Sequence, residues 1–265
     1  MAEIRALEPN GLTAASTFSG CGGSSLGYRM AGFRVGYANE FVEAARETYL
    51  ANAEPYTVVD GRDIRAVSGA EILEACGGSV DLLDGSPPCS DFSTAGKRDS
   101  GWGKVKQYSD TEQRVDDLFF EFTRLIGEVQ PRTFVAENVS GLVKGTAKGY
   151  FKLILSAMKD QGYRVQAKLL NASWLGVPQA RQRLIFIGVR DDLGFDPVHP
   201  KPLPYQYTVR EAICPDEPML AVYDTRGIFT PKDITDTPSS TITTQSDAHM
   251  QMFGGPQIEV DPETG

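Results

Sequence analysis

The stretch that decides the fold runs from residue 80 to residue 89 and reads Val80-Asp81-Leu82-Leu83-Asp84-Gly85-Ser86-Pro87-Pro88-Cys89. Its first half is a short apolar run with the length of a buried strand. The two prolines fix φ and end the strand, so that Cys89 is held on a stiff turn. Ligands of open α/β sheets bind beyond the carboxyl ends of strands, which makes Cys89 a candidate nucleophile. A buried structural cysteine is the alternative interpretation.

Strand-like and helix-like patterns alternate on both sides of this stretch. The predicted strands are 14–18, 34–40, 56–59, 133–139, 163–171 and 184–189. The predicted helices are 41–52, 111–129 and 149–161. Such alternation along the chain predicts an α/β fold with a parallel sheet.

Polar residues follow several of the predicted strands. The turn Ser19-Gly20-Cys21-Gly22-Gly23 precedes a helical pattern, and Glu40 ends the next strand about 20 residues later, as in nucleotide-binding sheets. Glycines let a ligand approach the backbone, and an acid at that position takes ribose hydroxyls. Asp63 and Glu137 also stand at strand ends, where Glu137 is either a general acid or a helix cap. The sequence therefore predicts a cofactor site at one edge of the sheet.

Basic residues occur in two further segments. Arg181 and Arg183 share one face of an extended segment and are expected to bind an anion or a base. Residues 94–110 are rich in Gly, Ser, Lys and Asp without periodicity, and a loop of this length predicts a mobile lid. The basic residues of the segment after Cys89 form a candidate groove for nucleic acid, with a solvated charged loop as the alternative; they are Lys97, Arg98, Lys104, Lys106 and Arg114.

The net charge of −9 is unevenly distributed. From residue 191 onward acidic residues outnumber basic ones 13 to 4, whereas residues 1–190 carry equal numbers. We therefore predict a boundary near residue 191 and a first part that tolerates a nucleic-acid partner. The 4 cysteines lack metal-type spacing, and with only 2 histidines they favour neither zinc nor disulfides and indicate a reducing compartment. Since no apolar run reaches membrane-spanning length, we expect no membrane partner.

Six segments in this order resemble those of the C5-cytosine DNA methyltransferases. They are Phe18-Ser19-Gly20-Cys21-Gly22-Gly23, Asn39-Glu40, Asp63-Ile64, Ser86-Pro87-Pro88-Cys89, Glu137-Asn138-Val139 and Gln179-x-Arg181-x-Arg183. The resemblance covers residues 13–190 and implies a Rossmann-like class I methyltransferase fold, with a mostly parallel, doubly wound sheet and helices on both faces. It implies an S-adenosylmethionine-binding catalytic domain at 1–190 and an incomplete target-recognition region at 191–265.

The same resemblance implies a site for S-adenosylmethionine and no metal. The implied binding residues are Phe18, Ser19, Gly20, Cys21, Gly22, Gly23, Glu40, Phe41, Asp63, Ile64, Ser86, Pro88 and Leu118. Phe41 would stack on the adenine, and Asp63 would bind its amine. Any cofactor contact from Leu118 is secondary to its place in a core-facing helix.

The catalytic residues implied by the resemblance are Cys89, Glu137, Asn138, Arg181 and Arg183. Cys89 would add to C6 of a cytosine in double-stranded DNA, which makes C5 able to accept a methyl group. Glu137 would stabilise the ring at N3, and Asn138 would hold Glu137 and the loop. The two arginines would steady the covalent adduct. The cytosine must be flipped out of the duplex, and the loop 93–107 would close over it.

Two departures from the family pattern affect these expectations. Ser90 follows the nucleophile where the family often has glutamine, and the family's later motifs, including a final helix that completes the cofactor pocket, are missing. A truncated chain, a split enzyme that needs a second polypeptide, and a degenerate member each explain the second departure. An RNA (tRNA) cytosine-5 methyltransferase and a non-catalytic binding protein stay open as alternatives. We expect a cytoplasmic, nucleoid-associated protein of a prokaryotic or phage-infected cell, acting in restriction protection, phage self-modification or regulation.

Overall fold

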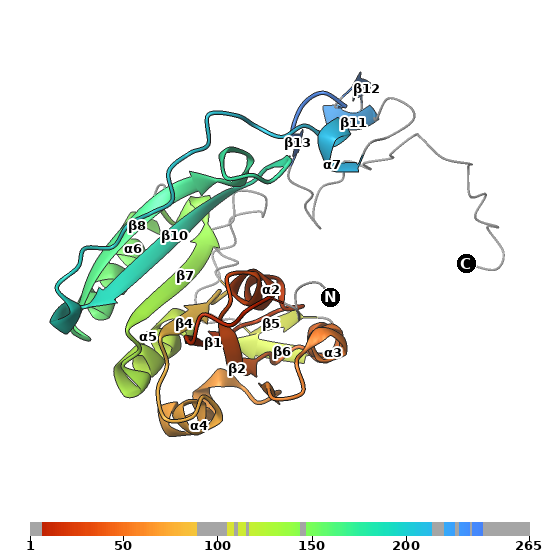
Figure 1. The fold of residues 1–265 in the computed structure, drawn as a ribbon. Helices are drawn as coiled ribbons and strands as arrows, with labels where there is room; N and C mark the ends of the chain where they lie inside the picture. The colour runs from red at the N-terminus through yellow and green to blue at the C-terminus, as the bar shows by residue number, and fades with distance from the viewer. Residues whose placement is uncertain are drawn as a thin grey trace. The chain divides into compact units, whose positions relative to one another are not determined.

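The computed structural model describes residues 7–88, 105–108, 111–114, 117–143, 147–213, 220–225, 228–233 and 235–240. Within them, a seven-stranded sheet has the order β3-β2-β1-β4-β7-β10-β8 (Figure 1). The bounds are β1 Thr13–Thr17, β2 Arg34–Asn39, β3 Val58–Asp60, β4 Leu82–Gly85, β7 Thr133–Val139, β8 Tyr163–Asn171 and β10 Gln182–Arg190. The strands from β3 to β7 in this order run parallel, and β10 runs antiparallel to β7. The predicted α/β fold with a mostly parallel sheet is confirmed.

Helices pack on both faces of this sheet, as in doubly wound folds. They are α2 Gly23–Met30, α3 Glu43–Asn52, α4 Gly69–Ala75, α5 Leu118–Val129 and α6 Ala147–Lys159, with the short 3-10 helices η1 Ile64–Ala66, η3 Ser140–Val143 and η5 Asp191–Leu193. Leu83 belongs to a core shared with α4, α5 and α6, whereas Leu82 packs with Tyr28 of α2. Because successive strand residues point to opposite faces, one strand serves both cores.

The larger core depends on α5. The buried residues of this helix are Leu118, Phe119, Phe122, Thr123, Leu125, Ile126 and Val129. The Phe122 ring packs edge-on against Phe134 of β7 at 6.2 Å between centroids. The apolar face of α5 is thereby removed from water against the central strands, which is the dominant favourable term in folding.

The segment before α5 differs from the prediction. Instead of a loop at 94–110 and a helix from 111, the structure has two antiparallel strands, β5 Val105–Tyr108 and β6 Thr111–Arg114, and α5 begins at Leu118. The strands are separated by two residues, a common length for hairpin connections, and this local pairing overrides the weak helical pattern there. The rest of the predicted lid, residues 93–104, lies outside the described residues.

The chain divides into two compact units. One contains Met1–Leu170 and Arg183–His199, and the other contains Asn171–Gln182 and Pro200–Gly265. The second unit holds the 3-10 helix η4 Ala172–Trp174, the strands β9 Gln179–Ala180, β11 Leu220–Thr225, β12 Ile228–Asp233 and β13 Ser239–Ser240, and the helix α7 Val209–Ile213. β13 pairs parallel with β9, and β11 pairs antiparallel with β12. A chain segment from before residue 191 thus clusters with the C-terminal residues.

No helix in the described ranges is long and apolar enough to cross a membrane. The same ranges contain no group of three or more His, Cys, Asp or Glu side chains that could hold a metal ion.

Candidate functional site

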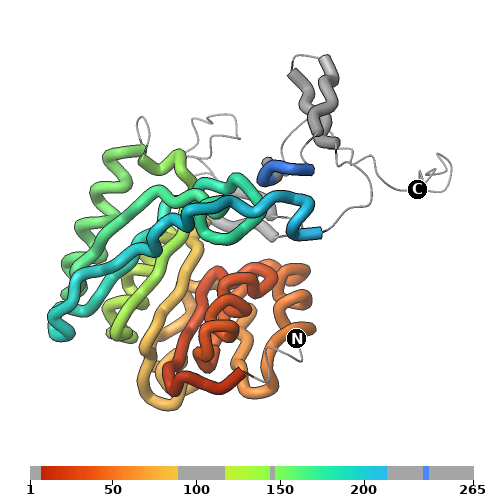
Figure 2. Tube along the Cα trace, turned by 45° about the horizontal axis from the view of Figure 1, so that its top comes forward, coloured from red at the N-terminus to blue at the C-terminus, as the bar shows by residue number. Residues whose placement is uncertain are grey.

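The parallel strands bring the predicted site segments to one edge of the sheet. The last residue of β1, Thr17, pairs with Asn39 of β2 on one side and with Gly85 of β4 on the other. Gly85 in turn pairs with Ala136 of β7. Figure 1 and Figure 2 both show the red segment of β1 and α2 beside the golden segment of β4. The segments that follow these four strands therefore start side by side.

The turn between β1 and α2 has the backbone geometry of a ligand-binding loop. Phe18, Gly20 and Gly22 all have positive φ, at 51°, 55° and 91°. Gly22 is the N-cap of α2, and no side chain caps this helix end. Uncapped amides at a helix amino end favour a carboxylate or phosphate. Ser19, in the middle of the turn, donates from its hydroxyl to the carbonyl and hydroxyl oxygens of Ser16.

Glu40 holds this turn against the end of β2. Its side chain is buried, with 8% exposure. One carboxylate oxygen accepts a hydrogen bond from the Gly20 amide at 2.7 Å, and the other accepts from the Val42 amide at 2.7 Å. The predicted ribose-binding acid is thus also a structural link between two cofactor segments. Phe41, the predicted adenine-stacking residue, is half-buried directly beside it.

Asp63 lies at the next strand end and caps η1. Its carboxylate accepts hydrogen bonds from the amide of Arg65 and from the Arg65 guanidinium, the latter at 2.9 Å. Arg65 also pairs with Asp117, directly before α5. The other two predicted cofactor residues nearby, Ile64 and Leu118, are buried in the core, with exposures of 1% and 0%. Ile64 and Leu118 therefore pack in the core next to the predicted site, whereas Asp63 places a carboxylate there.

A side chain of β7 forms a hydrogen bond to the segment that follows β4. The Asn138 side chain donates to the Pro87 carbonyl at 3.0 Å and accepts from the Val139 amide at 2.9 Å. Asn138 is 3% exposed, so this contact is shielded from water. Ser86 and Pro88 flank Pro87 and are half-buried. Cys89, two positions after Pro87, lies outside the described residues.

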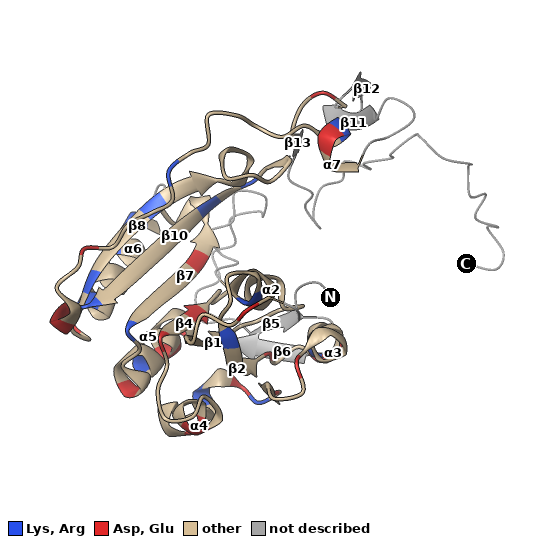
Figure 3. Cartoon of the chain, in the orientation of Figure 1, with Lys and Arg blue, Asp and Glu red and all other residues tan. Residues whose placement is uncertain are grey.

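Glu137 forms an ion pair with Arg183. The Arg183 Nε lies 2.6 Å from the Glu137 Oε1, with side-chain exposures of 23% and 33%. Figure 3 shows the acidic position of β7 beside a basic position of β10. Arg181 instead falls between β9 and β10, in the second unit, where its amide donates to the Gln179 carbonyl. The structure therefore brings Glu137, Asn138 and Arg183 together in the first unit.

Sequence reasoning missed Asp84 in β4 as a site residue. Its carboxylate is buried, with 4% exposure, and accepts hydrogen bonds from Ser16, Ser24 and Tyr28. Burial raises the pKa of Asp84, the hydroxyl donors oppose that shift, and the charge of Glu137 adds to it. The available signal was a carboxylate inside an apolar strand run, which must find partners when buried.

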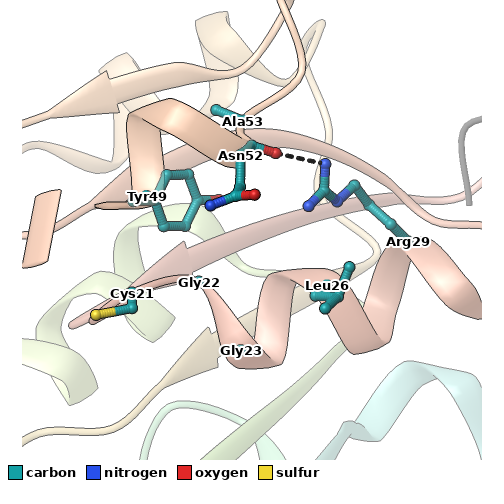
Figure 4. A pocket seen from close by; sticks show the side chains of 8 residues that line it. All are labelled: Cys21, Gly22, Gly23, Leu26, Arg29, Tyr49, Asn52 and Ala53. Carbon is teal, nitrogen blue, oxygen red and sulfur yellow. Dashed lines mark hydrogen bonds between the residues drawn. The ribbon is translucent and has the colours of Figure 1, made fainter. Parts of the chain in front are cut away.

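A cavity of about 180 Å³ opens between α2 and α3 (Figure 4). It is lined by Cys21, Gly22, Gly23, Leu26, Arg29, Tyr49, Asn52 and Ala53. Arg29 closes one end by donating to the Asn52 carbonyl at 3.0 Å. Three residues of the predicted cofactor turn therefore border this cavity, whereas the lining does not include Glu40, Phe41 or Asp63.

Comparisons with known proteins identify the family and relatives of the chain. Residues 12–251 match the family model described as C-5 cytosine-specific DNA methylase. The chain is 36% identical over 188 residues to the type II methyltransferase M.NgoFVII of Neisseria gonorrhoeae, covering 71% of this chain and 46% of that protein. It is 35% identical over 202 residues to the type II methyltransferase M.MthTI of Methanothermobacter thermautotrophicus, covering 75% of this chain and 55% of that protein.

Solved structures show the same fold. A putative DNA modification methyltransferase encoded within an E. coli prophage superimposes with a TM-score of 0.62 at 28% identity, covering 81% of this chain and 58% of that one. The DNMT2 mutant of Spodoptera frugiperda superimposes with a TM-score of 0.58 at 22% identity, covering 76% of this chain and 59% of that one. The chain spans about half the length of the curated relatives it matches. From the family match and the identity to these relatives, the chain belongs to the C-5 cytosine-specific DNA methylase family.

Proposed function

We propose that the chain is the S-adenosylmethionine-binding, catalytic part of a DNA (cytosine-5-)-methyltransferase. Its substrate is a cytosine flipped out of double-stranded DNA. The observation that carries the proposal is the buried hydrogen bond from Asn138 to the Pro87 carbonyl. It holds the backbone just before Cys89 against the strand that carries Glu137, and an activated nucleophile needs such a fixed neighbour.

The residues at the strand ends fit S-adenosylmethionine, which supplies an activated methyl group when bound. The uncapped amino end of α2 offers amides for its carboxylate, and the hydrogen bond from the Gly20 amide to Glu40 holds the turn 18–22 that leads into this helix. The Glu40 carboxylate stands at the end of β2, where ribose hydroxyls bind in nucleotide-binding sheets. Phe41 and Asp63 follow along the same edge and would hold the adenine.

Cys89 carries the chemistry of the cytosine ring. Its thiolate adds to C6 and forms a carbon–sulfur bond. The electrons of the C5–C6 double bond move toward C5 and, through C4, toward N3. Glu137 holds a proton at N3, where negative charge develops. C5 would then form a bond to the methyl carbon that bound S-adenosylmethionine supplies, the methyl–sulfonium bond would break with its electron pair kept on sulfur, and S-adenosylhomocysteine would be the product. Loss of the C5 proton to a base expels the thiolate and restores the aromatic ring.

Arginines and the segment after Cys89 hold the flipped base. Arg183 keeps the Glu137 carboxylate in place through the 2.6 Å ion pair. Arg181 contributes at the base or a phosphate. The basic residues of 93–107 contact phosphates, because phosphate contacts position a nucleic acid without reading its sequence. The protein acts on nucleoid DNA in a prokaryotic or phage-infected cytoplasm.

The test is a trapping experiment with 5-fluorocytosine DNA of mixed sequence. Fluorine at C5 blocks loss of the C5 proton, so that the covalent protein–DNA complex accumulates. We expect an adduct on a denaturing gel that requires S-adenosylmethionine and disappears in Cys89→Ala. Cys214→Ala is the matched control, which removes a thiol from the C-terminal part and keeps the adduct.

Two outcomes would redirect the proposal. An adduct with 5-fluorocytosine tRNA but not with DNA would assign an RNA substrate. No adduct from a folded chain that binds S-adenosylmethionine would indicate that a further segment or a second polypeptide is required, which is tested by adding the C-terminal half of a relative in trans.

A further inference from the structure

One carboxylate links the cofactor turn to the strand that leads to Cys89. The Asp84 Oδ2 accepts hydrogen bonds from the Ser16 hydroxyl at 3.0 Å and from the Ser24 hydroxyl at 2.6 Å. Its Oδ1 accepts from the Tyr28 hydroxyl at 2.9 Å. Ser16 belongs to β1, and the other two donors belong to α2. The three donors therefore flank the turn 18–22 on both sides.

The partners of Asp84 are neutral. In the described part of the chain no ion pair involves this residue, and hydroxyl groups alone cover its carboxylate. Burying a carboxyl group without a cation is unfavourable, and an apolar residue would serve the core of β4 better. The carboxyl group instead sets the relative position of the elements that it joins, because hydrogen bonds fix a distance and an angle, whereas apolar packing does not.

The same short segment is tied down at three further points. The Thr17 hydroxyl donates to the Asp84 carbonyl at 3.0 Å. At Gly85 an added Cβ would lie 2.5 Å from the Phe122 ring and 2.9 Å from the Thr17 hydroxyl oxygen, so the backbone runs in close contact there. Asn138 then holds Pro87. A shift of α2 is therefore transmitted through a segment that has little room to adjust.

We propose that Asp84 is a positioning residue that couples the cofactor turn to the segment carrying the nucleophile. The inference rests on the proposed function. Because Asp84 is 4% exposed and its carboxylate accepts from three hydroxyls, it acts through its neighbours and not by direct contact with a ligand. It sets the position of α2, whose amino end completes the turn, relative to β4, whose last residue precedes Cys89 by four positions. Loosening this link weakens cofactor binding and methyl transfer together.

The test measures binding and turnover in Asp84→Asn and Asp84→Ala in the full 265-residue chain. S-adenosylmethionine affinity is measured by calorimetry well below the melting temperature of each variant, and kcat and KM are measured by methyl transfer to DNA. For Asp84→Ala we expect the Kd for S-adenosylmethionine to rise and kcat to fall roughly 10- to 100-fold, the size of effect seen when a site is misplaced by a fraction of its contact distances. Asn should rescue part of both losses, because its oxygen still accepts from Tyr28 and its amide can donate to hydroxyls that turn round.

Asp81→Asn is the matched control. Asp81 also joins β1 to β4, by accepting from the Thr13 amide at 2.8 Å, but at the opposite end of the strands. We expect it to lower the melting temperature without changing the Kd for S-adenosylmethionine. A purely structural role for Asp84 predicts the same behaviour for both aspartates.

The outcomes separate the inference from the proposed function. Folded Asp84 variants with unchanged Kd and kcat would overturn the coupling while the proposed function stands. If the Asp84 variants do not fold, Tyr28→Phe and Ser24→Ala remove one donor each and must shift Kd in the same direction, or the inference fails. A wild-type chain that does not bind S-adenosylmethionine contradicts the proposed function itself, before any variant is considered.

Discussion

The two faces of the sheet are held by different forces. On the α5 face, buried aromatic rings pack in pairs. The ring centroids of Phe122 and Phe134 are 6.2 Å apart, and those of Phe119 and Phe186 are 5.6 Å apart. On the α2 face, a buried carboxylate and hydroxyls of Ser16, Ser24 and Tyr28 form hydrogen bonds. Apolar packing contributes most of the free energy of folding, whereas directional bonds specify where groups lie. We therefore expect the α5 face to contribute most of the stability of the domain and the α2 face to position the proposed site.

The largest effect should come from emptying the α5 face. Phe122→Ala leaves a cavity beneath Phe134 and should lower the free energy of unfolding by about 3–5 kcal/mol. Urea denaturation measures this change. Phe120→Ala, in the same helix but 39% exposed, is the control and should lose much less. Equal losses in the two variants would show that burial on this face is not what stabilises the domain.

A smaller loss of stability is expected when a side-chain atom is added to the packed core on the α5 face. At Gly188 of β10 an added Cβ would lie 2.0 Å from the Phe134 ring, so Gly188→Ala should destabilise by about 1–3 kcal/mol. Gly149 of α6 has no atom within 4 Å of such a Cβ. Gly149→Ala should therefore stabilise by about 0.4–1 kcal/mol. Thermal unfolding of both variants checks the pair, and a stabilised Gly188→Ala would contradict the tight packing.

On the α2 side, single hydroxyl groups should matter less for stability. Tyr49→Phe removes the hydrogen bond from the Tyr49 hydroxyl to Ser25, at 2.9 Å between buried groups. The expected loss is about 0.5–1.5 kcal/mol, measured by chemical denaturation. Tyr56→Phe removes a hydroxyl from a residue that is 45% exposed and should change nothing measurable. A loss as large as that of Phe122→Ala would break the contrast between the faces.

The pH dependence of stability offers the finest distinction. Burial raises the pKa of Asp84 above its usual value of 3.8, so the folded state binds more protons than the unfolded state just above that pH. Stability contributed by Asp84 is therefore fully present below the unfolded pKa and is lost as pH rises through the folded pKa. In Asp84→Asn this decline should disappear. Denaturation between pH 4 and pH 8 compares the two proteins.

The pKa of Asp60 is shifted in the opposite direction, so its contribution to stability depends on pH in the opposite way. Burial would raise its pKa, but hydrogen bonds from Arg62 and Tyr37 outweigh burial and lower it. Its contribution is present above the unfolded pKa and is lost as pH falls through the folded pKa. Asp60→Asn should therefore remove stability at neutral pH and flatten the acid side of the profile. If Asp84→Asn keeps the loss of stability above pH 4 that the wild-type protein shows, a group other than Asp84 causes that loss.

Much of the sheet was predictable from the sequence, because local patterns of apolar and polar residues mark its strands. The apolar runs at 133–139 and 163–171 became β7 and β8 with those bounds. The glycine turn and Glu40 stand at strand ends because a change from apolar to polar residues marks where a strand stops. The region before α5 was predicted wrongly, because short strands such as Val105–Tyr108 carry no strong period and depend on pairing with a partner.

By itself, the sequence determined the alternation of strands and helices, the mostly parallel sheet and which segments follow which strand, but it did not predict α4, β5 or β6. Only the tertiary structure decided how those segments meet. It pairs Glu40 with the Gly20 amide, Asn138 with the Pro87 carbonyl and Asp84 with hydroxyls from β1 and α2. These contacts join residues that are 20, 51, 60 or 68 positions apart. Local propensity acts over a few residues, whereas contacts at such separations depend on strand register and helix placement, which the folded chain settles as a whole.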